Sequence, residues 1–216
     1  MCGLFNDGQH NEAEKFLDKV TTNNFDPIIY AQAIFWKAEI AYRRADYATA
    51  QKGYALFLSL EQAVATEEYP MAFYNQGYTE FKLKQYRSAL NRFLQFQKLE
   101  SQVKNTKIIS DAYNRTGDCY FMLSELNNAK IQYQKVIDVG LYDVDYALYQ
   151  LAQTEGGMRQ FDTKIKTMKL LEENIQNHRI LLMLNMKSQV LISHADKTEK
   201  PQQPIRILFK NIREIH

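Results

Sequence analysis

The chain has 216 residues, of which 45% are hydrophobic and 24% are charged, and its formal net charge is +2. This length is sufficient for a sizeable buried core, and the small net charge argues against a dedicated nucleic-acid surface, which normally shows a basic patch or stripe. The two cysteines, Cys2 and Cys119, are too few for a disulfide framework, and no run of about 20 apolar residues predicts a membrane span.

Residues 1–27 carry only half of the pattern that fills the middle of the chain. Small and apolar residues recur there at the spacing of one helix face, and they match the second helix of a helix pair: Gly8, His10, Ala13, Leu17 and Val20. Because no matching first helix precedes them, we expect the chain to be a fragment, or Met1 to be a misassigned start.

Residues 28–173 contain a motif that returns at a nearly fixed interval. Each unit has one aromatic or apolar residue at its turn, and these anchors are Tyr47, Tyr86, Leu126 and Phe161. The steps between anchors are about 39, 40 and 35 residues, which is the range of helical-repeat proteins. The motif therefore predicts about four stacked helix pairs, with the extra residues forming longer connections at 62–68 and 101–106.

Small residues within each unit predict where two helices approach closely. One position is filled by Ala38, Gly77, Gly117 and Ala152, and a second by Ala50, Ala89 and Ala129. Large apolar side chains follow the second position by four and seven residues, as one buried helix face requires. The fourth unit is weaker, because Lys164 stands where the other units have alanine.

This combination of small and aromatic landmarks resembles the tetratricopeptide repeat family. The resemblance implies an all-α fold, a right-handed α-solenoid of stacked antiparallel helix pairs. The run from Phe35 to Tyr47 also resembles the subgroup found in bacterial cell-envelope assembly proteins, and this narrower resemblance bears only on localisation.

Residues 174–216 lose the repeat landmarks, and we predict that they are either a frameshift product or a divergent cap. Reverse translation of this tail, read one base earlier, permits another repeat unit in the correct register. If the tail is genuine, residues 179–192 could instead form a helix that caps the last repeat, ended by Pro201 and Pro204.

The sequence offers no constellation for catalysis, so we predict a protein that is not an enzyme and has no cofactor or metal. Its four histidines lack metal-ligand spacing, and no phosphate loop, nucleophile elbow or His-Glu-x-x-His motif occurs. Cys119 lies inside a predicted first helix, where we interpret it as a small buried apolar residue.

In the tetratricopeptide family the first helices of successive pairs line the concave face, so the resemblance places the candidate site there. We expect an aromatic groove with acids in the third unit, which would bind a peptide through apolar anchors and a basic residue near Asp111 and Asp118. The predicted partner-binding residues are Phe35, Glu39, Tyr42, Tyr74, Tyr78, Phe81, Asp111, Asn114, Asp118, Tyr146 and Tyr149.

The leading functional hypothesis is a scaffold that binds a protein or peptide within a bacterial envelope or another multiprotein assembly. Two alternatives stay open: a repeat module of a longer regulatory or sensor protein, and a module that binds glycan or peptidoglycan. Self-association through uncapped repeat ends is also expected to be possible. As written, the chain reads as cytoplasmic, and a missing upstream signal peptide would make it periplasmic or envelope-associated.

Overall fold

The structure is a computed structural model that describes residues 10–22, 26–140 and 142–177. The chain divides into two units, Met1–Leu171 and Glu172–His216, and each is described by itself. Of the second unit, residues 172–177 are described, and they are helical. The predicted frameshift or cap at 174–216 therefore lies almost wholly outside the described residues. It stays a prediction, as do the boundaries at 27 and 173.

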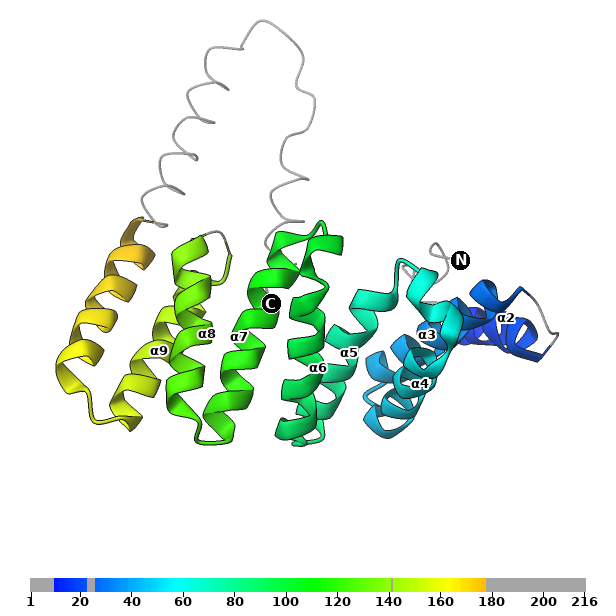
Figure 1. Ribbon diagram of the computed structural model, residues 1–216, viewed down its shortest axis with the longest axis horizontal. Coiled ribbons are helices and arrows are strands. Elements are labelled where there is room, and N and C mark those ends of the chain that lie inside the picture. Colours follow the sequence, from blue (N-terminus) through cyan, green and yellow to red (C-terminus); the bar gives the residue numbers. More distant parts are fainter. Residues whose placement is uncertain (1–9, 23–25, 141, 178–216) are drawn as a thin grey trace, which may run out of the picture. The chain divides into compact units, whose positions relative to one another are not determined.

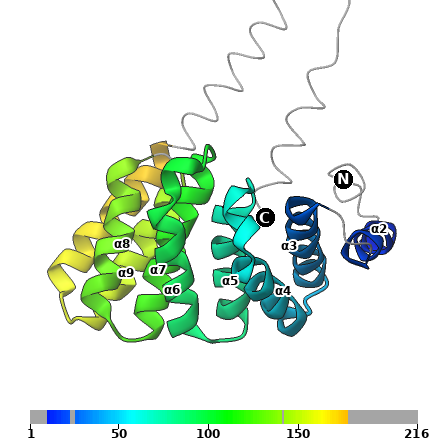
Figure 2. The same cartoon turned by 45° about the vertical axis from the view of Figure 1, so that its right-hand side comes forward.

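The first unit is a stack of helices, each of which packs mainly against its neighbours in the chain (Figures 1 and 2). No strand occurs in the described part of the chain, which confirms the all-α prediction. The pairs α3–α4, α5–α6 and α7–α8 make the most extensive contacts. The helices are α2 (His10–Thr22), α3 (Pro27–Arg43), α4 (Tyr47–Ser59), α5 (Tyr69–Lys82), α6 (Tyr86–Lys98), α7 (Thr106–Met122), α8 (Leu126–Val139) and α9 (Val144–Gly157). Residues 161–171 are also helical.

Local sequence explains where two of the first helices, α3 and α7, begin. The Asp26 carboxylate accepts a hydrogen bond from the Ile28 N–H at 2.8 Å, and Pro27 occupies the first helical position, where no N–H is needed. Asn105 caps α7 by accepting from the Lys107 N–H at 3.1 Å. The predicted longer connections contain two short 3₁₀ helices, η1 (Glu61–Ala65) and η2 (Glu100–Gln102).

The turn inside each helix pair repeats in geometry as well as in sequence. Ala45, Lys84, Ser124 and Arg159 lie two residues before the four anchors and have φ angles of 59°, 59°, 61° and 61°. The next N–H in each turn donates to the carbonyl five residues back, at 2.8 to 2.9 Å. Because a left-handed non-glycine residue costs roughly 1–2 kcal/mol, this recurrence in all four turns marks one shared turn design.

The core lies between the two helices of each pair and confirms the predicted close approaches. Ala50, Ala89 and Ala129 are fully buried, and so are the rings that follow them by four residues, Tyr54, Phe93 and Tyr133. Burial of each ring contributes on the order of 2–3 kcal/mol. A methyl carbon built on Gly77 would lie 2.8 Å from the Phe93 ring, and one built on Gly117 would lie 2.5 Å from the Tyr133 ring.

The fourth pair differs from the others at its turn. The anchors Tyr47 and Tyr86 pack against Tyr42 and Phe81, with ring centroids 5.5 and 5.3 Å apart. The fourth anchor, Phe161, is instead 61% exposed. Lys164, which replaces the small residue of the other units, lies against Gly156.

Candidate binding face on the first helices

The eleven predicted site residues all lie on the first helices α3, α5, α7 and α9, but three of them are buried. Phe35 is 3% exposed, Asn114 is 0% exposed and Asp118 is 6% exposed. These side chains offer almost no area to a partner, so their placement on an open surface was wrong. The α3 sequence is apolar on most sides, and helical spacing alone could not show which of its rings faces the core.

Phe35 and Asn114 have structural contacts that account for their burial. The Phe35 ring meets Trp36, Tyr54 and Phe57 edge to face, with centroids 5.3 to 5.8 Å apart. The Asn114 side-chain amide donates to the Asp143 carbonyl at 3.4 Å, which ties α7 to the start of α9. Both residues therefore join helices, and neither is retained as a partner contact.

Asp111 connects the second and third pairs through two phenols. The Tyr74 hydroxyl donates to the Asp111 carboxylate at 2.7 Å, and the Tyr78 hydroxyl donates to the same oxygen. Arg115, one turn further along α7, lies 3.4 Å from the other Asp111 oxygen. The two rings also pack against Phe93 on α6. Tyr74 and Tyr78 are thus held both at their hydroxyl groups and by T-shaped contacts of their rings.

Asp118 connects the third pair with α9. Its carboxylate accepts hydrogen bonds from the Tyr133 hydroxyl at 2.8 Å and from the Tyr146 hydroxyl at 2.8 and 2.9 Å. Arg115 Nη1 lies 2.6 Å from Asp118, and the guanidinium carbon lies 4.6 Å above the Tyr146 ring. Burial raises the pKa of Asp118, and Arg115 and the two phenols oppose that shift.

Glu39 has the same role between the first and second pairs. It accepts hydrogen bonds from the Tyr54 hydroxyl at 2.7 Å, from the Asn75 amide at 3.0 Å and from Arg43 at 3.1 Å. The three predicted acids are therefore carboxylate hubs that bind neighbouring helices to each other. Because Asp111 and Asp118 are occupied within the chain, the expected contact with a basic residue of a partner loses its support.

The carboxylate hubs were identifiable in the sequence by a pairing within each repeat. Glu39 and Asp118 occupy the position after the small first-helix residue, and each accepts from the tyrosine 15 residues later. In the second unit that later residue is Phe93, which has no hydroxyl, and the first-helix position holds Tyr78. An acid therefore appears where the facing ring is a phenol, and this covariation among repeats was the missed signal.

The buried phenols give the protein a predicted sensitivity to alkaline pH. Burial first, and a neighbouring carboxylate second, raise the pKa of Tyr54, Tyr74, Tyr78 and Tyr133 above that of free tyrosine. A raised folded-state pKa stabilises the fold below the unfolded value of about 10, and this stability is lost as pH rises beyond it.

We therefore expect urea midpoints to fall steadily from pH 9.5 to pH 11, while tyrosine absorbance at 295 nm reports these phenols ionising together with unfolding. Equal urea midpoints across that range would show that the phenols titrate in the folded protein without cost.

The remaining predicted residues keep part of their surface in solvent. Tyr149 is 48% exposed, and Tyr42, Phe81 and Tyr146 are half-buried. Burial raises the pKa of Tyr42 to about 12, so its hydroxyl stays protonated at neutral pH. This partly open surface, together with the outer edges of Tyr74 and Tyr78, is called the first-helix face below.

Few reactive groups are found in the described ranges. No cluster of three or more His, Cys, Asp or Glu side chains there could hold a metal ion. Cys119 is fully buried, as predicted, and burial raises the pKa of its thiol to about 12. Cys2, His178, His194 and His216 lie outside the described residues. Of the helices that are described, none is long and apolar enough to cross a bilayer.

Comparison with known proteins identifies the fold. No protein-family model and no curated protein matches this sequence. A crystal structure of MamA aligns over 82% of this chain and 94% of its own, with a TM-score of 0.67 and 17% identity. BtubC (BKLC) from P. vanneervenii aligns over 93% of this chain and 80% of its own, with a TM-score of 0.65 and 13% identity.

A third similar structure is that of a protein with TPR-like repeats. It is a putative kinesin light chain with nearly identical TPR-like repeats from Podosopora anserina, which aligns over 80% of this chain and 92% of its own. Its TM-score is 0.60 at 10% identity. At these identities the likeness concerns the fold alone, and the chain has the fold of a tetratricopeptide-type helical-repeat solenoid.

Proposed function

We propose that this chain is a non-enzymatic scaffold that binds a protein or peptide along its first-helix face. Repeat stacks of this kind present an extended surface made by successive units, and such surfaces suit extended or helical segments. The similarity to solved repeat proteins supports this class of function.

One observation carries the proposal: three aromatic side chains of the first-helix face are fixed before any partner arrives. Tyr74 and Tyr78 are held by Asp111, and Tyr146 is held by Asp118 and stacked under Arg115. A ring that is already immobile loses little conformational entropy on binding, so its apolar area contributes more fully to affinity. Tyr149 adds an exposed ring on the same helix as Tyr146.

A bacterial envelope complex, or another multiprotein assembly, is the setting we propose for this scaffold. The support is the sequence resemblance of the run from Phe35 to Tyr47 to envelope assembly proteins. Part of that run is buried, because Phe35, Ala38, Ile40 and Ala41 have less than a tenth of their surface exposed. The resemblance in this run therefore reflects helix packing as well as partner choice.

Tyr149→Ala is the sharpest test of the first-helix face, because Tyr74 and Tyr78 also support the fold. Peptides selected from a random 16-residue display library would be measured by fluorescence anisotropy against the wild type and this variant. We expect Tyr149→Ala to weaken binding about tenfold, the effect of losing one large interface ring.

Ile131→Ala is the matched control, since Ile131 is 53% exposed but lies on the second helix α8. It should leave the affinity unchanged. If the selected peptides bind the wild type and Tyr149→Ala equally, or respond to Ile131→Ala instead, the first-helix face is not the binding surface. Pelleting with peptidoglycan would reveal the glycan alternative in the same samples.

Self-association also remains part of the proposal. In the helical segment 161–171, Phe161 and Ile165 are one turn apart and are 61% and 55% exposed. Apolar side chains exposed this far favour contact with another copy. Sedimentation velocity across a concentration series would detect such a dimer. A sedimentation coefficient that stays at the monomer value at every concentration would rule out self-association.

A further inference from the structure

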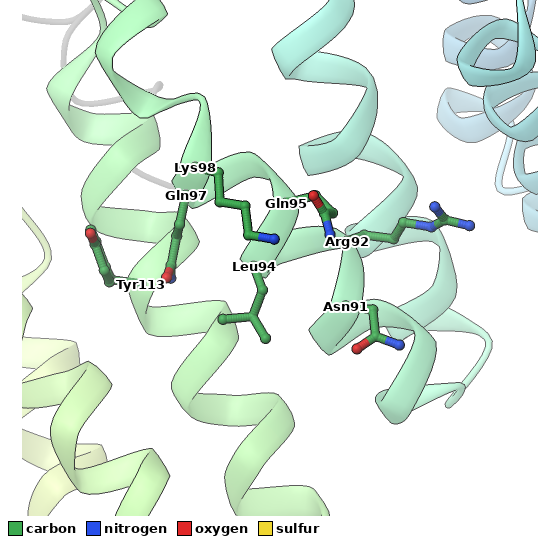
Figure 3. Close-up of a pocket in the computed structure, with 7 residues that line it drawn as sticks. All are labelled: Asn91, Arg92, Leu94, Gln95, Gln97, Lys98 and Tyr113. Carbon is green, nitrogen blue, oxygen red and sulfur yellow. The ribbon is translucent and has the colours of Figure 1, made fainter.

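A second surface feature lies on α6, a helix that carries none of the residues of the first-helix face. It is a hollow of about 710 Å³ between α6 and α7. Figure 3 shows its lining, in which Tyr113 comes from α7 and the other labelled side chains come from α6. Along α6 the hollow meets Asn91, Leu94, Gln95 and Lys98, which are spaced as one helix face.

The charge of this lining is positive. It contains Arg92 and Lys98 and no acidic residue. Arg92 lies 3.5 Å from Glu80, whose side chain is only 3% exposed, so the guanidinium is anchored at one edge. Lys98 is exposed, and within the described part of the chain its ammonium group has no ion-pair partner. An anion entering the hollow would therefore meet an available cation.

The opposite wall is aromatic and fixed. The Tyr113 hydroxyl donates to Glu100 at 2.9 Å, and the Lys135 ammonium lies 5.0 Å from the centre of the Tyr113 ring. Lys135 adds a positive charge beside the hollow and Glu100 adds a negative one, so the cation without a partner is Lys98. Tyr113 and Leu94 supply apolar area, so this wall could hold the stem of a bound side chain as well as its charge.

The amide groups of the lining fall into two classes. Gln97 is occupied, because its amide donates to Thr116 at 2.9 Å and to Gln132 at 3.3 Å. Asn91 and Gln95 have no hydrogen-bond partner among the described residues, and they lie one turn apart on α6. Each amide can donate and accept at once, which matches the alternating N–H and C=O groups of an extended peptide.

We propose that this α6 hollow binds an extended acidic segment of a partner protein. A carboxylate of the segment pairs with Lys98, its main chain pairs with Asn91 and Gln95, and an apolar side chain packs between Leu94 and Tyr113. From Asn91 to Lys98 the helix rises about 10 Å, which is the length of roughly three extended residues. This site is independent of the proposed first-helix face and could operate whether or not that face binds anything.

The test uses a fluorescein-labelled octapeptide of alternating glutamate and leucine, blocked at both ends, and the same peptide with glutamine in place of glutamate. Fluorescence anisotropy on the full chain should show tighter binding of the glutamate peptide. Lys98→Glu should weaken that binding at least about tenfold, since it reverses the available charge. Gln95→Leu keeps the charge and should weaken binding several-fold by removing the main-chain partner.

Lys169→Glu is the matched control, because it makes the same charge change at an exposed lysine outside the hollow. It should bind the glutamate peptide as the wild type does. The proposal is overturned if the two peptides bind alike, or if Lys98→Glu and Lys169→Glu have equal effects on the affinity for the glutamate peptide. It is also overturned if inorganic polyphosphate displaces the peptide and Gln95→Leu leaves the affinity for the peptide unchanged. Circular dichroism of each variant confirms that the fold is intact.

Discussion

Asp118→Ala is expected to lower the free energy of unfolding by about 3–5 kcal/mol, the usual cost of removing one partner from a buried ion pair. The change leaves the Arg115 charge with only the more distant Asp111 oxygen, at 3.4 Å. It also leaves the hydroxyls of Tyr133 and Tyr146 without their acceptor. Urea unfolding followed by circular dichroism at pH 7 measures the difference.

Two further variants distinguish the effect of losing the buried Asp118 hub from the effect of losing any one negative charge. Asp138→Ala removes an exposed carboxylate from α8 and should leave the urea midpoint nearly unchanged. The double variant Arg115→Met with Asp118→Leu should recover part of the loss, because apolar groups of similar size often replace a buried ion pair without penalty. An Asp118→Ala protein as stable as the wild type would mean that the hub does not connect the repeats.

Gly117→Ala is expected to destabilise the protein by about 2 kcal/mol, although alanine favours helices by about 1 kcal/mol over glycine. The added methyl carbon would lie 2.5, 2.7 and 2.9 Å from three atoms of the Tyr133 ring. The ring cannot swing aside, because it is fully buried and its hydroxyl is held by Asp118. Overpacking of a rigid neighbour therefore outweighs the gain in helix propensity.

Gly156→Ala is the matched control for this prediction. Its methyl carbon would meet the flexible end of Lys164, at 3.1 Å, and that side chain can move into solvent. Helix propensity should then dominate, and the variant should be slightly stabilised. A double-mutant cycle with Tyr133→Leu provides the physical check, since Gly117→Ala should cost much less once the ring is gone. Additive effects of the two changes would show that the clash is not the cause.

The sequence alone was sufficient to predict the helix pairs and their close approaches. Small residues at Gly77 and Ala89, followed by large apolar groups at helical spacing, have one simple physical solution, which is two helices in contact. The structure adds that the turn of each of the four pairs contains a residue in the left-handed conformation, and none of these residues is glycine. Alanine, lysine, serine and arginine fill those positions, so residue type gave no signal there.

The candidate site could be predicted only in part. Helical register placed all eleven residues on the first helices, but it could not rank their exposure. Tyr149 and Phe35 illustrate the difference: the former is 48% exposed and the latter 3%. Exposure depends on the neighbouring helix pairs, and sequence periodicity describes one helix at a time.

The sequence by itself thus determined the repeat, its period and the small and large residues that meet between paired helices, because these follow from local spacing and side-chain size. Only the tertiary structure decided what the polar residues do. Glu39, Asp111 and Asp118 look like a binding surface in the sequence, and they act as connections between pairs because phenols from other helices reach them. A carboxylate's role depends on which donors come within about 3 Å, and those donors are set by helix packing.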